Sequence, residues 1–351
     1  MDYLSDKAKG LKPYIAGIQP KESGWIKLNT NENPYPPSPR VAEALQNASI
    51  QSLRLYPDGD SAGLREAVAA NVGVSAENVF AGNGSDEVLA LAFQAFFSGK
   101  NNVLTPDISY GFYPVWSGMY GVGARVIPLY EDFTVRIGDY HNGNGVILAN
   151  PNAPTGMALS LPEVEELVRA NPCGVVMIDE AYIDFSGVAS AVELVGRYSN
   201  LLVVRTFSKS HSLAGLRVGY AIGDSRLIDG LRAVKDAFHS YPLGILAQAL
   251  AQAAISDAGY CAETVRRIIV TRDQTASKLR GLGWRVLPSQ TNFLFVEAEN
   301  AKELYEHLLA HQILVRYWDM SRINRFLRIT IGTDAEMEVL IQCIEKQRKQ
   351  R

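Results

Sequence analysis

The sequence predicts an α/β fold in which helices cover a mostly parallel sheet, followed by a smaller α+β unit. Short apolar runs recur between residues 79 and 222, and several are continuous rather than alternating, as is typical of strands buried on both faces. Helical segments lie between some of these runs, which is the order that brings parallel strands into one sheet. From about Leu243 a long helical region gives way to strand runs separated by one helix, which indicates the second unit.

The predicted elements divide the chain into an N-terminal arm (1–40), a large domain (41–242) and a small domain (243–351). Closely spaced prolines in the arm forbid a helix and favour an extended chain, although residues 25–28 look like a short strand. In the large domain we expect strands at 79–81, 103–104, 125–127, 146–149, 175–178, 201–204 and 218–222, and helices at 40–47, 62–70, 88–97 and 161–169. In the small domain we expect a helical region at 243–282, a helix at 301–310, and strands at 284–287, 293–296, 313–315 and 326–331.

Length and composition favour a globular, cytoplasmic protein. A chain of 351 residues exceeds what one ordinary core needs, and a net charge of -3 gives no basis for a nucleic-acid or anionic-membrane partner. The three cysteines (Cys173, Cys261 and Cys343) are far apart and form no CxxC motif, which fits a reducing compartment. The N-terminus lacks the basic-then-apolar order of a signal peptide, and no apolar run is long enough to span a bilayer.

Lys209 stands in a polar turn between the apolar runs 201–204 and 218–222. A lysine at the end of a buried strand is unusual, because burial of an ammonium group is costly unless the group is paired or chemically changed. A Schiff base with an aldehyde cofactor is one such change. The alternative is a strand-end lysine whose amine reaches solvent, as most lysines do.

Two further strand ends carry polar groups suited to a ligand. Residues 82–86 (Gly-Asn-Gly-Ser-Asp) precede a helix, where exposed N–H groups would bind a phosphate or, alternatively, Ser85 or Asp86 would merely cap the helix. Asp179 ends the most continuous apolar run, where its carboxylate requires a partner. A protonated pyridine nitrogen is a matching partner; a magnesium ion or a capped turn is the alternative.

One ligand satisfies these features together. Lys209 would supply the Schiff base, and Asp179 would lie under a basic ring nitrogen. Ser208 and Arg217 would hold a phosphate. Pyridoxal 5'-phosphate carries an aldehyde, a basic ring nitrogen and a phosphate, so the combination predicts this cofactor.

In these motifs the sequence resembles the fold type I pyridoxal-phosphate aminotransferases, and within them the histidinol-phosphate aminotransferase branch. The resemblance covers nearly the whole chain. Its motifs occur in the family's order: Asn31-Glu32-Asn33-Pro34, Arg54-Leu55-Tyr56-Pro57, Gly84-Ser85-Asp86-Glu87, Tyr110-Gly111-Phe112-Tyr113, Pro154-Thr155-Gly156, Asp179-Glu180-Ala181-Tyr182, Ser208-Lys209, Ala214-Gly215-Leu216-Arg217 and Leu327-Arg328-Ile329-Thr330. It implies transamination between L-histidinol phosphate and 2-oxoglutarate. An aromatic amino acid aminotransferase and a threonine-phosphate decarboxylase of the same fold are the alternatives.

The resemblance also implies a role for each cofactor residue. Lys209 binds the cofactor covalently and moves a proton, Asp179 pairs with the pyridine nitrogen, and Tyr182 bonds the cofactor 3'-oxygen. Tyr110 stacks on the ring. The phosphate ligands are Ser85, Asp86, Ser208 and Arg217. Tyr56 reaches the phosphate of the neighbouring subunit's cofactor, which implies a homodimer.

Three residues are expected to bind substrate. Arg328 matches an arginine that takes the α-carboxylate and helps to hold the substrate phosphate, Arg316 matches a second arginine, and Tyr14 matches a pocket tyrosine on the arm. An ordinary surface cation is the alternative for Arg316. One position departs from the family: Ala153 stands where an asparagine usually precedes Pro-Thr-Gly, which leaves Asn152 as the candidate contact to the cofactor 3'-oxygen.

No metal site is expected from the histidines. His307 and His311 have the i, i+4 spacing of two ligands on one helix face, but the sequence shows neither an HExxH glutamate nor a third ligand. We therefore expect a solvated helix face there.

Overall fold

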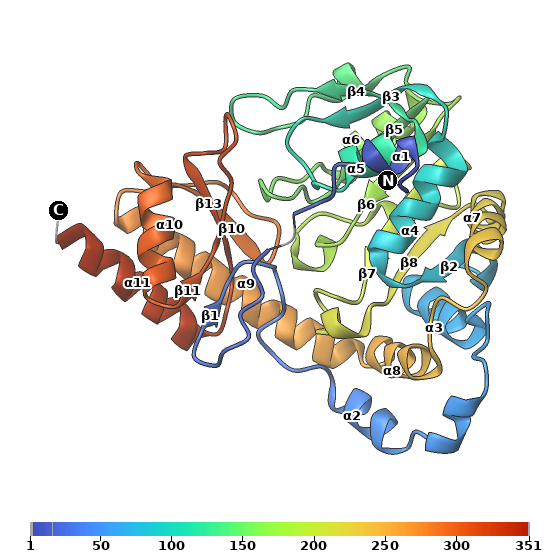
Figure 1. Ribbon diagram of the computed structural model, residues 1–351, viewed down its shortest axis with the longest axis horizontal. Coiled ribbons are helices and arrows are strands. Elements are labelled where there is room, and N and C mark those ends of the chain that lie inside the picture. The colour runs from blue at the N-terminus through green and yellow to red at the C-terminus, as the bar shows by residue number, and fades with distance from the viewer. Residues whose placement is uncertain (1–2, 16, 350–351) are drawn as a thin grey trace.

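The computed structural model describes residues 3–15 and 17–349, which form a large sheet between layers of helices and a smaller sheet beside it (Figure 1). The large sheet has seven strands in the order β2-β8-β7-β6-β5-β3-β4. Their bounds are β2 (Val79–Gly82), β3 (Asn101–Pro106), β4 (Gly123–Ile127), β5 (Gly145–Ala149), β6 (Val175–Asp179), β7 (Leu201–Thr206) and β8 (Gly219–Gly223). Neighbouring strands are parallel except that β8 runs antiparallel to β2 and β7. The predicted α/β architecture is confirmed.

The strands of this sheet are apolar on both faces because helices cover both. Along β6, Met177 packs with residues of α4 (Gly84–Ala92), α5 (Tyr113–Tyr120) and α7 (Ser225–Phe238). Its neighbours Val176 and Ile178 pack on the opposite face, with residues of α3 (Ala62–Val72), α6 (Leu161–Arg169) and α8 (Ile245–Ile255). Burial of each side chain of this size stabilises the fold by roughly 1.5–3 kcal/mol relative to leaving it exposed to water. This two-sided burial explains why the apolar runs are continuous.

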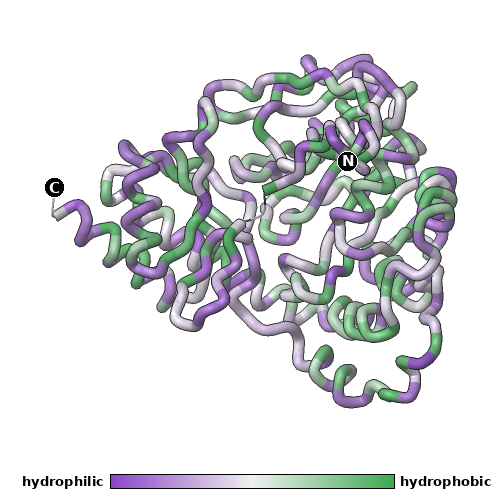
Figure 2. The backbone as a smooth tube through the Cα atoms, viewed as in Figure 1, coloured by the Kyte–Doolittle hydropathy of each residue, from purple (hydrophilic) through white to green (hydrophobic). Residues whose placement is uncertain are grey.

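The smaller sheet has the order β12-β13-β10-β9 and is antiparallel throughout. Its strands are β9 (Arg285–Val286), β10 (Phe293–Glu297), β12 (Arg316–Tyr317) and β13 (Phe326–Thr330). Three helices share its apolar cluster: α9 (Ala258–Gly281), α10 (Ala301–Ala310) and α11 (Asp334–Lys349). Hydrophobic and hydrophilic stretches alternate along α11 (Figure 2), and Leu340 and Ile344 on its apolar side are fully buried.

The N-terminal arm is tied to the region of the smaller sheet. β1 (Ile26–Lys27) pairs in parallel with β11 (Ile313–Leu314), which confirms the short strand expected at 25–28. The backbone N–H of Asn31 donates to the Thr330 hydroxyl at 3.0 Å. Residues on the C-terminal side of β1 therefore lie against the end of β13.

The long helical region expected at 243–282 is two helices, α8 and α9. Asp257 caps the second helix, since its carboxylate accepts a hydrogen bond from the N–H of Tyr260 and another from the Ser38 hydroxyl. An N-cap of this kind begins a new helix, and apolar periodicity alone did not predict the break.

The remaining elements are short. They are α1 (Asp6–Lys9), α2 (Pro39–Gln46), the π-helical η3 (Phe93–Phe97), and the 3-10 segments η1 (Ile50–Arg54), η2 (Ala76–Asn78), η4 (Ile137–Tyr140), η5 (Ile183–Phe185), η6 (Ala191–Leu194) and η7 (Ala214–Leu216). Among the described helices, none combines the length and the hydrophobicity that crossing a membrane requires.

Candidate active site

The polar residues predicted to form a site meet at one edge of the large sheet. β6 ends at Asp179 and β7 at Thr206, and because these strands are parallel their following turns lie at the same edge. β2 also ends there, at Gly82, which is in register with Gly219 of β8. Since β8 runs in the opposite direction, Arg217 lies at this edge just before β8 begins.

Asp179 is a buried carboxylate, 5% exposed. Its Oδ2 accepts a hydrogen bond from the Tyr113 hydroxyl at 2.8 Å, and its Oδ1 accepts one from the N–H of Ala181 at 3.2 Å. Burial raises the pKa of Asp179 to about 6, although both hydrogen bonds and the Lys209 ammonium act to lower it. A buried carboxylate gains from a cationic partner, and a protonated pyridine nitrogen has the required charge.

Lys209 directs its amine into the protein. Its Nζ donates to the carbonyl oxygen of Thr30 at 3.0 Å and lies 5.7 Å from the centre of the Tyr182 ring. The Tyr182 hydroxyl accepts a hydrogen bond from Nδ2 of Asn31 at 2.8 Å. Asn33 donates through its own Nδ2 to the Lys209 carbonyl oxygen at 3.2 Å. Residues 30–33 of the arm thus position both the lysine and the tyrosine.

A partly buried ion pair supports the turn that carries Lys209. Arg205 on β7 pairs with Asp184, which also accepts a hydrogen bond from the hydroxyl of Ser210. Although burial opposes it, the Arg205 guanidinium lowers the pKa of Asp184, so this carboxylate stays ionised. The residue directly after Lys209 is therefore fixed to the core by a charge-assisted hydrogen bond.

The turn from β2 into α4 faces the guanidinium of Arg217. No side chain caps the start of α4 at Asn83, so the first N–H groups of this helix are available to an anion. Arg217 Nη2 lies 3.1 Å from Asp86 Oδ2, and Nη1 lies 3.5 Å from the Ser208 hydroxyl. Gly84 has φ +79°, and a Cβ there would lie 2.6 Å from Arg217 Nη2. Helix N–H groups and a guanidinium that lie this close together could bind a phosphate.

Tyr110 connects the start of α4 to the arm. Its hydroxyl donates to Asp86 Oδ1 at 2.7 Å. Burial and the Asp86 carboxylate raise the pKa of Tyr110 well above its usual value, so the hydroxyl stays protonated. The Tyr14 ring lies 6.2 Å from the Tyr110 ring and stacks on Phe112 at 4.3 Å. The arm tyrosine therefore reaches the loop that carries Tyr110.

The chemistry of these groups fits pyridoxal phosphate. Lys209 offers an amine for the aldehyde, Asp179 a buried carboxylate for the ring nitrogen, and Arg217 a cation beside a helix N-terminus for the phosphate. Tyr113 and Asn31 belong to the same cluster, and we did not predict roles for them. Both stand in motifs visible in the sequence, but only the folded chain shows that one holds Asp179 and the other holds Tyr182.

Arg316 and Arg328 are direct cross-strand partners on β12 and β13. Arg328 donates through Nη2 to the Asn29 carbonyl oxygen at 2.8 Å, while its Nε is buried without a hydrogen-bond partner. Burial and the nearby Arg316 charge lower the pKa of Arg328. Arg316 donates to the carbonyl oxygen of Ile15 at 3.0 Å, and each guanidinium lies 5.3 Å from the Trp318 ring centre. Two guanidinium groups held this close together favour an anionic ligand.

Asn152 does not have the hydrogen-bonding freedom that the cofactor contact requires. Both hydrogens of its side-chain amide are used, since Nδ2 donates to the Ile108 carbonyl oxygen and to the Thr155 hydroxyl, each at 3.0 Å. Its Oδ1 accepts a hydrogen bond from Ser109 at 2.7 Å. An amide has only two N–H donors, so the expected donation from Asn152 to the cofactor 3'-oxygen is not supported, and Asn152 instead braces the turn after β5.

Tyr56 lies on a different part of the surface. Its ring stacks on Tyr241 at 4.8 Å, and the residue is 82% exposed. Other large apolar side chains are exposed in the segments just before Tyr56 and just before Tyr241, namely Ile50, Leu53, Leu55 and Phe238. The structure therefore places Tyr56 in an exposed apolar patch rather than among the residues described above.

Comparisons with known proteins agree over most of the chain. Residues 23–344 match the family described as aminotransferase class I and II. The histidinol-phosphate aminotransferase 1 of Bordetella parapertussis is 51% identical over 350 residues, which cover 98% of each chain. The histidinol-phosphate aminotransferase of Brachyspira hyodysenteriae is 47% identical over 346 residues, again covering 98% of each chain. The crystal structure of histidinol-phosphate aminotransferase from Sinorhizobium meliloti in complex with pyridoxal-5'-phosphate has a TM-score of 0.82 and 25% identity, and covers 92% of this chain and 91% of that chain.

Proposed function

The chain belongs to the class I and II aminotransferase family and is a pyridoxal-phosphate-dependent transaminase, and we propose that it exchanges an amino group between L-histidinol phosphate and 2-oxoglutarate. The products are imidazole-acetol phosphate and glutamate, in histidine biosynthesis. The observation that carries this proposal is the similarity, 51% identity over 98% of both chains, to a relative named for this activity.

Asp179 and Tyr182 are proposed to control the ring of the cofactor. Bound pyridoxal phosphate supplies an electron sink for the charge that develops at the substrate α-carbon. Asp179 would keep a proton on the ring nitrogen, and Tyr113 holds its carboxylate in place. Tyr182 accepts its hydrogen bond from Asn31, so its own hydroxyl hydrogen is free to be donated to the 3'-oxygen.

Lys209 is proposed to carry the proton during transfer. Its Nζ, once free, would remove the proton from the substrate α-carbon and return it at the aldehyde carbon of the cofactor. The contact of Nζ with the Thr30 carbonyl and the anchored Ser210 beside it keep the amine within the cluster.

The cofactor phosphate is proposed to lie at the N-terminus of α4. Its ligands there would be the backbone N–H groups of Ser85 and Asp86, the Ser208 hydroxyl and the Arg217 guanidinium. The uncapped start of α4 and the distance of 3.5 Å between Arg217 and Ser208 support this assignment.

Arg328 and Arg316 are proposed to bind the anionic ends of the substrates. The unpartnered Nε of Arg328 is a buried donor that requires an acceptor, and a carboxylate or phosphate oxygen would supply it. Arg316, the cross-strand partner of Arg328, would share the phosphate of histidinol phosphate. Tyr14, stacked on Phe112, would close the substrate pocket from the arm.

We further propose a cytoplasmic homodimer in which Tyr56 reaches the cofactor phosphate of the neighbouring subunit. The exposed apolar side chains around Tyr56, with Ile50 77% exposed and Phe238 76% exposed, support an interface, because contiguous exposed apolar patches mark interaction sites. The three free cysteines fit a reducing compartment.

The decisive assay offers purified holoenzyme several amino donors with 2-oxoglutarate and measures glutamate. Histidinol phosphate should be the preferred donor. Turnover of aromatic amino acids without turnover of histidinol phosphate would assign the chain to an aromatic aminotransferase instead. Release of carbon dioxide from threonine phosphate, with no keto-acid acceptor present, would assign it to a decarboxylase.

A further inference from the structure

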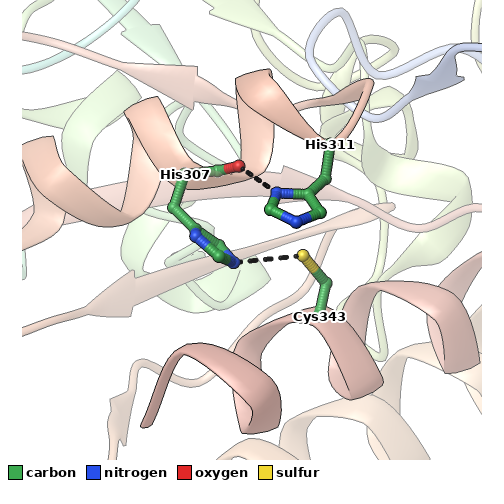
Figure 3. A group of neighbouring side chains, drawn as sticks. All are labelled: His307, His311 and Cys343. Carbon is green, nitrogen blue, oxygen red and sulfur yellow. Dashed lines mark hydrogen bonds between the residues drawn. The ribbon is translucent and has the colours of Figure 1, made fainter. Parts of the chain in front are cut away.

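A second cluster of reactive side chains lies on the helices that cover the smaller sheet. His307 is in α10, His311 caps the C-terminal end of α10, and Cys343 is in α11 (Figure 3). One ligand atom from each of these side chains lies within 4.8 Å of the other two. In the part of the chain that the structure describes, no other group of three His, Cys, Asp or Glu side chains comes together in this way. The sequence predicted a solvated histidine face, and the third member was not visible because it comes from another helix.

The distances in this cluster suit a metal ion. His307 Nε2 lies 3.4 Å from the sulfur of Cys343. In a tetrahedral site with Zn–S of about 2.3 Å and Zn–N of about 2.0–2.1 Å, these two atoms are roughly 3.6 Å apart. The rings of His307 and His311 have their centres 4.3 Å apart, so the second imidazole lies beside the pair formed by His307 and Cys343.

The orientation of His311 is already that of a ligand. Its Nδ1 lies 2.9 Å from the carbonyl oxygen of His307. A carbonyl oxygen only accepts hydrogen bonds, so Nδ1 carries the hydrogen and Nε2 of the neutral ring keeps its lone pair. Figure 3 shows this second nitrogen facing the sulfur of Cys343. A backbone carbonyl on the far nitrogen is the outer contact that metal-bound histidines typically make.

A thiol-to-imidazole hydrogen bond accounts for the contact between Cys343 and His307, but not for the third ligand atom, from His311, that lies within 4.8 Å of both. The burial pattern also resembles that of a metal site. Cys343 is 7% exposed, His307 is half-buried and His311 is exposed. The sulfur is thus shielded while the side of His311 remains open to an entering ion.

We propose that His307, His311 and Cys343 bind one Zn²⁺ ion, with water in the fourth position. Two imidazoles and a thiolate select zinc over magnesium or calcium, which prefer oxygen ligands. Binding releases the thiol proton of Cys343 to solvent. The ion links α10 to α11 and stabilises the smaller unit, and it takes no part in amino transfer, which is carried out at the edge of the large sheet.

The test begins with holoenzyme freed of metal by a chelator that is then removed. Titration with Zn²⁺ against a chromophoric chelator should show one ion per chain at a specific site. Co²⁺ in place of Zn²⁺ should give the strong visible bands of a tetrahedral site and a thiolate-to-metal absorption, read as difference spectra because the cofactor also absorbs. Absence of stoichiometric Zn²⁺ binding would overturn the proposal.

Variants identify the ligands. Cys343→Ser keeps a hydrogen-bonding group but lacks the thiolate, and His311→Gln changes an exposed residue. Each should weaken Zn²⁺ binding by more than the roughly 10- to 100-fold that loss of an outer contact typically costs. The matched controls are Cys173→Ser and His239→Gln, which alter an exposed cysteine and an exposed histidine outside the cluster and should bind Zn²⁺ as the wild type does.

Transamination reports whether each variant is folded, because all of them should retain it. Zn²⁺ should raise the Tm of the wild type and of both controls but not that of Cys343→Ser. If Cys343→Ser fails to fold, His311→Gln decides the matter alone. Wild-type affinity in His311→Gln, or an unchanged thiolate absorption in folded Cys343→Ser, contradicts the proposed site.

Discussion

Tyr113 donates its hydroxyl hydrogen to the carboxylate of Asp179 across 2.8 Å, and both residues are buried. Burial and the adjacent Asp179 charge raise the pKa of Tyr113 well above its usual value, so it remains a donor at every physiological pH. The position and charge of the proposed ring-nitrogen partner therefore depend on a tyrosine from a different element, the first turn of α5.

Replacing Tyr113 with phenylalanine should weaken cofactor binding. The substitution removes a hydrogen bond to a charged group, worth about 1.5–3 kcal/mol, and leaves Asp179 more costly to ionise. We expect roughly 10- to 100-fold weaker retention of pyridoxal phosphate, measured by equilibrium dialysis. Tyr120→Phe, on the same helix, is the control and should bind as the wild type does. Equal affinities in the two variants would show that Asp179 does not need Tyr113.

Asp179 should make the cofactor-free protein less stable as the pH rises. Burial raises its pKa in the folded protein from 3.8 to about 6. The stability of the protonated, buried carboxyl is therefore fully present below pH 3.8 and is lost as the pH rises through 6, where the buried group must ionise. This difference between the folded and the unfolded pKa corresponds to about 3 kcal/mol. The free energy of unfolding of Asp179→Asn minus that of the wild type should therefore be larger at pH 8 than at pH 4, by up to about that amount. Urea unfolding of the cofactor-free proteins measures it. A difference that does not change with pH would contradict this.

Lys209→Ala should abolish transamination and the yellow absorbance of the bound cofactor together, because both depend on the same amine. Lys278→Ala, which changes an exposed lysine paired with Glu338, should lose neither. The measurements are glutamate formation and the visible spectrum of the purified protein. Survival of both signals in Lys209→Ala would remove the lysine from the mechanism.

Arg328 and Arg316 should differ in which substrate they affect. Arg328→Gln should raise KM for glutamate and for histidinol phosphate by roughly 10- to 100-fold, since each loses a charge-assisted hydrogen bond. Arg316→Gln should raise KM chiefly for histidinol phosphate, which alone carries a phosphate. Arg325→Gln, an exposed arginine beside β13, is the control. A rise in KM for glutamate alone in Arg316→Gln would reverse the proposed roles.

Mixed dimers should reveal the contact made by Tyr56. A Tyr56→Ala subunit lacks the tyrosine but keeps Lys209, whereas a Lys209→Ala subunit keeps the tyrosine but lacks the lysine. Pairing them should restore one site with wild-type cofactor retention, because that site receives Tyr56 from its neighbour. The readout is cofactor bound per dimer after dialysis. Failure of the mixed dimer to retain more cofactor than the Tyr56→Ala homodimer would place Tyr56 outside the neighbouring site.

The sequence predicted the large sheet well because its signal is local. Val176, Met177 and Ile178 point alternately to the two faces of the sheet, and all three are buried. An unbroken apolar run was therefore sufficient to identify β6. The meeting of Asp179 with the turn of Lys209 also followed, since residues after parallel neighbouring strands share an edge. These predictions required only the spacing of the apolar residues along the chain and the relative direction of the strands.

The contacts that the sequence did not predict depend on side-chain direction or on distant segments. Asn152 stands beside a motif position, yet its amide donates to Thr155 in its own turn and to Ile108 in the loop after β3. Asn31 reaches Tyr182 from 151 residues away, and Cys343 meets His307 from 36 residues away. Neither periodicity nor motif spacing encodes such pairings, because they depend on how separately folded elements pack.

The reversal of β8 sets a limit on how the length of this chain can vary. Because β8 runs against β7, the segment from Lys209 to Arg217 leaves and re-enters the same sheet edge as a single loop. An added residue in extended chain displaces the residues after it by up to about 3.3–3.6 Å, more than a hydrogen bond tolerates. Insertions and deletions should therefore be absent from residues 209–217 in functional variants and concentrate in loops at the opposite edge, where neither the amine nor the guanidinium would be displaced.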